Sequence, residues 1–396
     1  MPRTGHPIEI DGRAKAPLGM PASEFLRDYW QKKPLLIRNA FPGFVSPITA
    51  DDLAGLACEP YSLSRLIVHD TVSDHWSVES GPFEESRFAS LPETDWTLLV
   101  QDVDKWDQDV AAVLESFDFL PDWRIDDVMV SYAAPDGSVG AHVDQYDVFL
   151  LQASGHRYWM IDDREDAPTG FRADQELKLL ERFEASHEWL LGPGDMLYLP
   201  PGVPHHGIAA GETDCLTFSV GLRAPSVAEL AADFVEHLAE RMPESMRYAD
   251  PDLEPAREPG EIDVIALKRV RELLASALAA DDAAQADWFG RFITRYRAAG
   301  FAAPRTPPMT ASAFAKKLAA GRGALMRHPL SRFAFQRGRD HATLFVAGDR
   351  FRVDTKLAQR LCRHLPIALP EAAGFERDTI ELLRTLVNRG HLEFVR

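Results

Sequence analysis

The residue pair with the clearest chemical potential is His142 and Asp144, in the segment GAHVDQYDVFLL. In a β-strand, residues i and i+2 point to the same face, so this pair aims an imidazole and a carboxylate at one point. His-x-Asp triplets are common, and the pair alone indicates little. Further along the chain, the segment PPGVPHHG follows the strand-like DMLYL and offers two more histidines. The two segments together predict a metal site.

His205 and His206 compete for the third ligand position of this site. On a strand they would face opposite ways, so only one of them can join the metal. We choose His205, which directly follows Pro204. Two histidines and a carboxylate on one face leave open coordination positions, as non-heme iron(II) oxygenases require for a cosubstrate and O₂. We therefore predict His142, Asp144 and His205 as the ligands of Fe(II) and as the catalytic residues.

A metal-chelating keto acid would supply the electrons that iron(II) needs to oxidise a C–H bond. Its far carboxylate requires a cation inside the barrel, and Arg157, in the segment SGHRYWMID, can bind a carboxylate through two hydrogen bonds. The alternative is a surface arginine paired with Asp162 or Asp163. Ser131 and Thr217 lie on strands expected to line the same cavity, where their hydroxyls are weaker candidates for cosubstrate binding.

The mouth of the site should be formed by Gln145, Tyr146 and Asp147, which directly follow the first two ligands. An aromatic ring and a carboxylate would suit a guanidinium substrate. Strand alternation places Tyr146 on the metal side and Asp147 on the other, so both cannot point inward from a regular strand. For Asp147, a turn or surface carboxylate is an equally good interpretation.

The elements that position these residues are short strands rich in β-branched and aromatic residues, separated by Gly, Pro and Asp turns. They include DVMVSYAA, DVFLLQAS, HRYWMID, DMLYLPP and CLTFSVGLRA. Many short strands at this spacing predict a mainly β core, a jelly roll or double-stranded β-helix. An N-terminal helix from a cap-like Ser23 to Pro34 precedes it. This catalytic domain is expected to span residues 1–225.

The pattern becomes helical after residue 225. Three amphipathic helices are expected in 226–242, 261–280 and 283–300, and their apolar faces could pack internally or against a second copy. After a linker, residues 301–396 alternate short helices with a β-hairpin, which predicts a winged-helix-like domain. Its helix KLAQRLCRHL carries Lys356, Arg360 and Arg363, as a nucleic-acid-binding helix would. The acidic chain as a whole leads us to favour a protein contact over direct nucleic-acid binding.

The composition of the chain indicates its cellular compartment and the charge of its partners. The chain has 396 residues, a formal net charge of −18 and three well-separated cysteines without a CxxC pair. The cysteines predict neither a disulfide framework nor a cysteine zinc site, and they fit a reducing compartment. No apolar run predicts a membrane span, and the first residues lack the apolar core of a signal peptide. We expect a cytoplasmic protein whose acidic surface attracts basic partners.

Three segments of the chain carry a resemblance to a known family. The segments GAHVDQYDVFLLQASGHRYW, PGDMLYLPPGVPHHG and FSVGLRAP resemble the JmjC-type bacterial ribosomal oxygenases of the cupin superfamily. The resemblance is dense over about residues 20–225 and looser, by domain order, beyond. It implies iron ligation by His142, Asp144 and His205 and binding of 2-oxoglutarate by Arg157. It also implies hydroxylation at C3 of an arginine in large-subunit ribosomal protein number sixteen, and a homodimer through residues 226–300.

The chain departs from the usual family motif at Val203 and His206, where PPGFPHEG is common, and at Thr217, where relatives often have Asn. Other functions remain open at this stage. They are a histidyl hydroxylase of another ribosomal protein, a histone-type demethylase, a cupin enzyme that works without 2-oxoglutarate, and a non-enzymatic binding module. The His-x-Asp pair and Arg157 argue against the cupin enzyme, and the intact ligand residues argue against the binding module.

Overall fold

The structure is a computed structural model that describes residues 7–213, 215–256, 258–279, 281–296, 300, 302–363 and 365–395. The chain divides into two compact units, Met1–Ala224 and Pro225–Arg396, which are described separately. The predicted boundary at residue 225 falls beside this division. The finer boundary at residue 300 stays a prediction.

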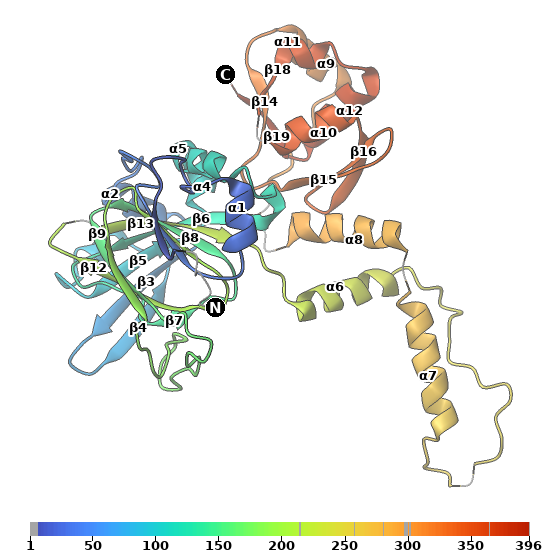
Figure 1. Cartoon of the computed structure of the whole chain (residues 1–396). Helices are drawn as coiled ribbons and strands as arrows, with labels where there is room; N and C mark the ends of the chain where they lie inside the picture. Colours follow the sequence, from blue (N-terminus) through green and yellow to red (C-terminus); the bar gives the residue numbers. More distant parts are fainter. Residues whose placement is uncertain are drawn as a thin grey trace. The chain divides into compact units, whose positions relative to one another are not determined.

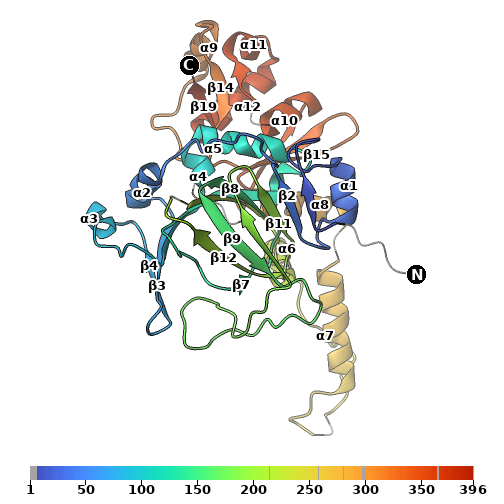
Figure 2. The ribbon, with the colours of Figure 1, turned by 60° about the vertical axis from the view of Figure 1, so that its left-hand side comes forward.

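The first unit is built on two β-sheets (Figures 1 and 2). The larger sheet has nine strands in the order β1-β2-β11-β8-β13-β6-β5-β3-β4. Its strands are β1 (Glu9–Asp11), β2 (Leu35–Arg38), β3 (Ser64–Asp70), β4 (His75–Ser80), β5 (Trp96–Val100), β6 (Ile125–Ala133), β8 (Val148–Ser154), β11 (Met196–Leu199) and β13 (Cys215–Leu222).

The smaller sheet has four strands in the order β10-β9-β12-β7. They are β7 (His142–Val143), β9 (His156–Ile161), β10 (His187–Leu191) and β12 (Pro204–Ala210). Strand β12 is central to the site because it pairs with β7 on one side, His205 opposite His142, and with β9 on the other, Ala209 opposite Arg157. The strands predicted from the sequence are therefore present, in a jelly-roll arrangement.

Alternation gives the larger sheet two different faces. One face contributes Val130, Phe149 and Phe218 to the main hydrophobic cluster, which also includes Phe25 of helix α1 (Ala22–Asp28). Residues between them, such as Thr217, therefore point to the opposite face, toward the smaller sheet. The main apolar core thus lies behind the larger sheet. A second apolar cluster, which includes Leu150 and Trp159, lies between the two sheets beside the polar side chains of the interior.

Short helices interrupt the strands of this unit and were not predicted individually. They are α2 (Ala50–Cys58), α3 (Glu85–Phe88), α4 (Val103–Trp106), α5 (Gln108–Ala112) and the 3-10 turns Val113–Phe117 and Asp122–Arg124. The predicted start and end of α1 are wrong. Pro21, not Ser23, is its N-cap, and it ends at Asp28, well before Pro34, because Gln31 adopts a left-handed backbone with φ of 55°.

The second unit contains three helices followed by a mixed α/β region. The helices are α6 (Val227–Ala239), α7 (Val264–Ala277) and α8 (Asp282–Arg295). Helix α6 begins with a capping box in which Ser226 and Glu229 satisfy each other's backbone amides. Helix α8 packs on the sheet β15-β16-β17, where Gly290 leaves room for the ring of Phe345.

The mixed region holds α9 (Ala311–Ala319), α10 (Thr355–Cys362), α11 (Leu369–Ala373) and α12 (Arg377–Asn388) around two small sheets. One sheet has the order β18-β14-β19, with β14 (Ala324–Arg327), β18 (Ile367–Ala368) and β19 (Leu392–Val395). The other is the meander β15 (Phe333–Arg337), β16 (Ala342–Val346) and β17 (Asp349–Val353). The predicted hairpin is present, and it turns at Ala347 and Gly348, which both have positive φ. Strands β14 and β18 and helix α11 were not predicted.

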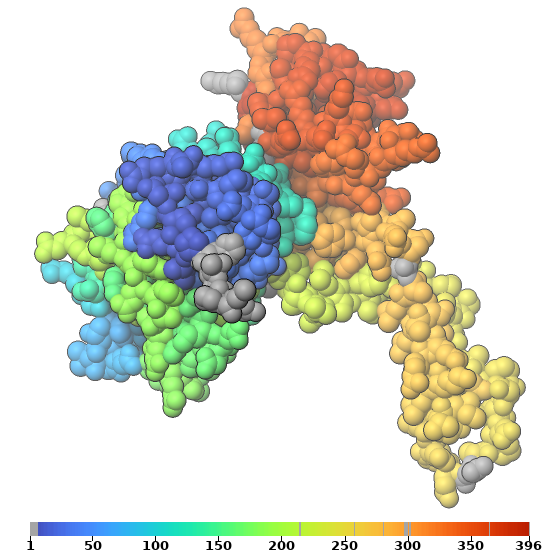
Figure 3. Space-filling model, viewed as in Figure 1, coloured from blue at the N-terminus to red at the C-terminus, as the bar shows by residue number. Residues whose placement is uncertain are grey.

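Helix α7, like α6 and unlike α8, has no buried residue. It exposes Val264, Ile265, Leu267, Val270 and Leu274 by 42% to 80%. Figure 3 shows its side chains on the surface of the unit rather than in a core. Internal packing therefore does not cover the apolar face of α7 in the described chain. None of the described helices has the length and hydropathy of a membrane span.

Candidate metal and cosubstrate site

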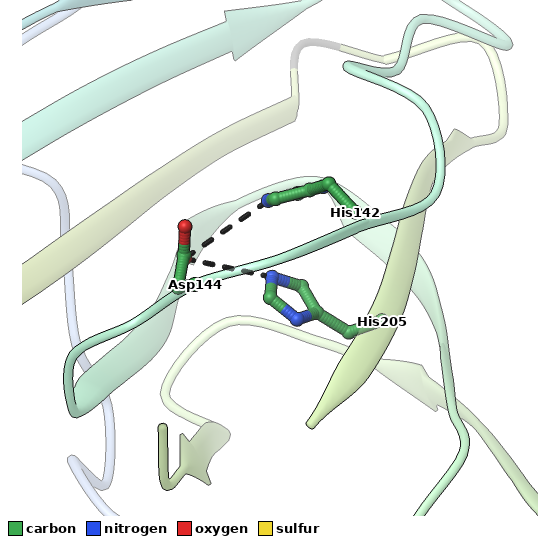
Figure 4. Close-up of side chains that lie close together, drawn as sticks. All are labelled: His142, Asp144 and His205. Atoms are coloured by element: carbon green, nitrogen blue, oxygen red, sulfur yellow. Dashed lines mark ion pairs between the residues drawn. The ribbon is translucent and has the colours of Figure 1, made fainter. Parts of the chain in front are cut away.

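His142, Asp144 and His205 form a group whose potential ligand atoms all lie within 4.8 Å of one another. Asp144 Oδ2 is 4.0 Å from Nε2 of His142 and 3.7 Å from Nε2 of His205 (Figure 4). The two imidazole rings have centroids 4.2 Å apart. The three side chains thus converge on one point, as their spacing in the sequence predicts.

Hydrogen bonds fix which nitrogen each histidine presents. Nδ1 of His142 lies 2.9 Å from the Gly140 carbonyl oxygen, and Nδ1 of His205 lies 2.9 Å from that of Val203. A carbonyl only accepts, so each Nδ1 carries a proton and donates it. The lone pair of each neutral ring is then on Nε2, the atom that faces Asp144. This is the tautomer that a metal ligand requires.

His205 and its neighbour His206 have different environments. Burial, followed by the charge of His142, lowers the pKa of His205 to about 4, which keeps the ring neutral and able to bind a cation. His206 points to the other face of β12, where its Nε2 lies 3.0 Å from Ser138 Oγ. The structure therefore brings His205, and not His206, to the candidate metal site. Burial also lowers the pKa of His206 to about 4.

Arg157 is a buried cation with little to bind. Its side chain faces the barrel interior beside Trp159, with the guanidinium carbon 5.8 Å from the ring centroid. Its Nη1 is 3.5 Å from the Gly207 carbonyl oxygen, while Nε and Nη2 are buried without a hydrogen-bond partner, as is Nε1 of Trp159. Asp162, the surface partner considered above, is instead paired with Arg164. Unsatisfied buried donors are costly and require an explanation, and an anionic ligand would provide one.

Polar side chains from the larger sheet line the interior opposite Arg157. Ser131 and Thr217 are directly paired across β6 and β13, and both are buried. The hydroxyl of Thr217 donates to Gln152 Oε1 at 3.1 Å, and that of Ser131 lies 3.5 Å from the Thr217 carbonyl oxygen. Gln152 is fully buried and was missed, although an amide in the otherwise apolar strand VFLLQAS could have signalled it.

Tyr146 lies beside the metal group, on the side that alternation predicted. Its ring is 38% exposed, and burial of the hydroxyl, followed by the charges of Asp144 and Asp127, raises the pKa of the phenol. Asp127, on β6, was not predicted as a site residue. Burial and the charge of Asp102 raise the pKa of its carboxyl to about 7. Gln145 is exposed, and its predicted substrate contact stays a prediction.

Asp147 does not belong to this group. Its side chain is fully buried and accepts hydrogen bonds from Tyr198 at 2.7 Å and Gln31 at 2.8 Å, and it pairs with Arg124 at 3.2 Å. These partners lie on the side away from Tyr146. The prediction that Asp147 binds substrate does not fit this position, because its carboxylate already holds the N-terminal segment against the barrel.

Comparisons with known proteins agree with this fold and site. A JmjC domain model matches residues 112–230, and a ROXA-like winged helix model matches residues 277–393. The ribosomal protein uL16 3-hydroxylase of Escherichia coli is 38% identical over 289 residues, which cover 72% of this chain and 74% of that protein. A probable ribosomal oxygenase of Haemophilus influenzae is 44% identical over 207 residues, 52% of this chain and 50% of that protein.

Solved structures extend the likeness to nearly the whole chain. The X-ray structure of E. coli YcfD superimposes with a TM-score of 0.81 at 34% identity, covering 95% of this chain and 98% of that one. A second YcfD structure, in complex with cobalt and 2-oxoglutarate, has a TM-score of 0.79 at 33% identity, with 95% and 99% covered.

The jelly roll and the convergent His-Asp-His group define a JmjC-type oxygenase of the cupin superfamily. Within that class, the chain belongs to the family of ribosomal oxygenases that carry a C-terminal winged helix. The predicted family, fold class, enzyme class and cofactor class are confirmed.

Proposed function

We propose that this chain hydroxylates ribosomal protein uL16 at C3 of an arginine side chain, using Fe(II), 2-oxoglutarate and O₂. The observation that carries the proposal is the pairing of two features in one barrel. Three ligand atoms of the right kinds converge within 4.8 Å, and a buried arginine with unpartnered nitrogens lies on the adjoining strand. The uL16 hydroxylase of E. coli supports the choice of substrate.

The residues present fit the implied metal. His142, Asp144 and His205 would hold Fe(II) through two neutral imidazoles and a carboxylate, the donor set of non-heme iron oxygenases. Bound iron supplies the activation of O₂, in which 2-oxoglutarate becomes succinate and CO₂ and one oxygen atom enters the substrate C–H bond. The carbonyls of Gly140 and Val203 orient the two rings, so that no ligand has to reorganise when the metal binds.

Arg157 would anchor the far carboxylate of 2-oxoglutarate. Its free Nε and Nη2 are adjacent donors, which suits a two-oxygen acceptor. Ser131 and Thr217 face the same interior and are proposed to contact the cosubstrate. Contact with Thr217 requires its hydroxyl to release Gln152, because a carboxylate can only accept a hydrogen bond.

Tyr146 and Asp127 would receive the guanidinium of the substrate arginine. An aromatic face and a carboxylate together satisfy a planar cation. The pKa of Asp127 is raised by burial of its carboxyl and by the negative charge of Asp102. An incoming guanidinium would supply a compensating positive charge and favour the ionised form.

Two further proposals, a homodimer and a cytoplasmic location, follow from the family resemblance. A homodimer through residues 226–300 would cover the exposed apolar face of α7. Light scattering would test it by comparing the molar mass of the Leu267→Glu variant with that of the wild type. The variant should be monomeric, because a dimer would have to bury the new charge. The ribosomal substrate supports the expected cytoplasmic location.

The function is tested by incubating purified chain with uL16, Fe(II), 2-oxoglutarate and O₂. We expect a gain of about 16 Da, one oxygen atom, on one arginine, located by fragmentation mass spectrometry. A gain on a histidine of another ribosomal protein would support the histidyl hydroxylase instead. A His142→Ala protein should give no product, and absence of any gain with the metal-loaded wild type would refute the proposal.

A further inference from the structure

Charge is distributed very unevenly along this acidic chain. Residues 301–396 contain 17 Lys and Arg against 8 Asp and Glu, an excess of nine positive charges. The preceding 300 residues contain 26 Lys and Arg against 53 Asp and Glu. The negative charge of the whole chain disfavours nucleic-acid binding, but residues 301–396 carry a net charge of the opposite sign.

Four of these bases gather at one end of the sheet β15-β16-β17, which we call the basic end: Arg337, Arg339, Arg352 and Lys356. Arg337 closes β15 opposite Ala342, and Arg339 lies in the turn where the Gly338 amide donates to the His341 carbonyl at 2.8 Å. Arg352 on β17 is opposite Thr343, and Lys356 follows on the first turn of α10. The register of the three strands therefore places at one end of the sheet bases that are up to 19 positions apart in the sequence, with Arg352 on the face of Gln336 and Thr343 and Arg337 on the opposite face.

The four side chains are exposed, and none makes an ion pair with a described residue. Most other arginines around them are neutralised: Arg350 by Asp287, Arg360 by Glu371, Arg384 by Glu381 and Arg389 by Asp349. Two carboxylates lie near the basic end. Asp340 is exposed in the turn, and Asp354 accepts the backbone amides of Lys356 and Leu357 as the N-cap of α10. The positive charge of the basic end is thus left for an external partner.

We propose that the basic end binds the phosphate backbone of RNA. Exposed arginine and lysine at the end of a three-stranded sheet and at an adjoining helix start fit a polyanion with regularly spaced charges. Gln336 and Thr343, which share a face with Arg352, are polar and offer no apolar anchor. The choice of RNA over an acidic protein rests on the proposed function, because a ribosomal protein substrate is destined to contact ribosomal RNA. Helix α12 contributes little, since its Arg377 and Arg384 are offset by Asp378 and Glu381.

The binding is tested by fluorescence anisotropy of a labelled RNA duplex of about 20 base pairs with the full-length chain, between about 50 and 200 mM KCl. We expect measurable affinity that falls steeply with salt. Changing all four bases to Gln should weaken binding at least tenfold and reduce the slope of log affinity against log salt by about one for each lost phosphate contact.

The matched control changes Lys316, Lys317, Arg322 and Arg377 to Gln, which removes the same charge from other exposed sites of the unit. Both variants should keep the wild-type melting temperature. An equal loss in the control, or no RNA binding by the wild type, would overturn the proposal. Competition by polyglutamate as strong as that by RNA at equal charge would assign the surface to an acidic polypeptide instead.

The same variants separate this inference from the proposed function. Hydroxylation of free uL16 without RNA should be unchanged by the substitutions at the basic end, which lie outside the metal and cosubstrate site. RNA binding without hydroxylation would refute the function alone, and hydroxylation without RNA binding would refute the inference alone.

Discussion

Replacing Arg157 with Met should abolish productive binding of 2-oxoglutarate without destabilising the free protein. Methionine keeps much of the length and the apolar stem of arginine but has no charge. In the free protein the guanidinium has only a 3.5 Å contact to the Gly207 carbonyl, and two of its nitrogens are buried and unpartnered. Removing a buried, unsatisfied cation leaves no other charge unpaired. The melting temperature of the free variant should therefore equal or exceed that of the wild type.

The magnitude of the binding loss follows from the pairing that Arg157 would make. Truncating one partner of a buried, hydrogen-bonded charge pair costs about 2–5 kcal/mol. At about 1.4 kcal/mol for each factor of ten, the affinity for 2-oxoglutarate should fall about 30-fold to 4,000-fold. The metal affinity should be unchanged, because the ligands are held by the Gly140 and Val203 carbonyls and not by Arg157.

The assay is calorimetric titration of 2-oxoglutarate into the manganese-loaded protein, repeated with 2-oxopentanoate, which lacks the far carboxylate. The wild type should bind 2-oxoglutarate more tightly than 2-oxopentanoate, by about the same factor as the loss of 2-oxoglutarate affinity in the Arg157→Met variant. The variant should bind the two keto acids with equal affinity. Arg164→Gln is the control, since Arg164 is half exposed and its ion-pair partner is Asp162 rather than a group in the cosubstrate region. A variant that melts early but still prefers 2-oxoglutarate would show that Arg157 is structural and would refute the reasoning.

Three further predictions concern the residues around the site. His205→Ala should reduce manganese affinity at least about tenfold while His206→Ala leaves it nearly unchanged, as measured by titration, because only His205 faces Asp144. Burial raises the pKa of Asp127 to about 7, so the folded chain binds a proton that the unfolded chain has lost, and stability falls as pH rises from about 4 to 7. Urea unfolding should accordingly give Asp127→Asn a higher free energy of unfolding than the wild type above pH 7, by at most about 1.4 kcal/mol for each unit of the pKa shift. Below about pH 4 the two proteins should be equally stable. Asp147→Asn should lower the free energy of unfolding by about 3 kcal/mol by leaving Arg124 without its partner, with no selective change in the KM for uL16.

The part of the site that could be predicted from the sequence is the part that strand geometry fixes. The i, i+2 spacing of His142 and Asp144, and the opposite directions of His205 and His206, follow from alternation and hold in the structure. Asp127 could not be found in this way, because its proximity to Tyr146 depends on which strands adjoin in the sheet. Strand alternation correctly predicted that Asp147 points away from the metal side. Its hydrogen-bond partners could not be predicted, because they lie up to 116 positions away in the sequence.

In the fold, too, features with a local sequence pattern could be predicted, and features that depend on distant contacts could not. Strands with strong alternation were predicted within one or two residues, whereas α1 ends where tertiary contacts stop it. Tyr29 is buried and its hydroxyl donates to the Pro7 carbonyl at 2.8 Å, and the Gln31 amide donates to the Tyr198 hydroxyl. Neither contact has a local signal. The short helices α4 and α5 were not predicted, because segments of four or five residues are too short to show a helical period.

Gly207 shows how the metal and cosubstrate regions of the barrel are linked. It faces the interior between His205 and Ala209 on β12, directly opposite Trp159 on β9. A Cβ at this position would lie 2.7 Å from the indole ring, so only glycine lets the ring occupy that space. The ring in turn lies beside the Arg157 guanidinium, whose Nη1 reaches the Gly207 carbonyl. The strand that presents His205 to the metal therefore also sets the position of the cation that would hold 2-oxoglutarate, and the spacing between the two is fixed by backbone register rather than by flexible side chains.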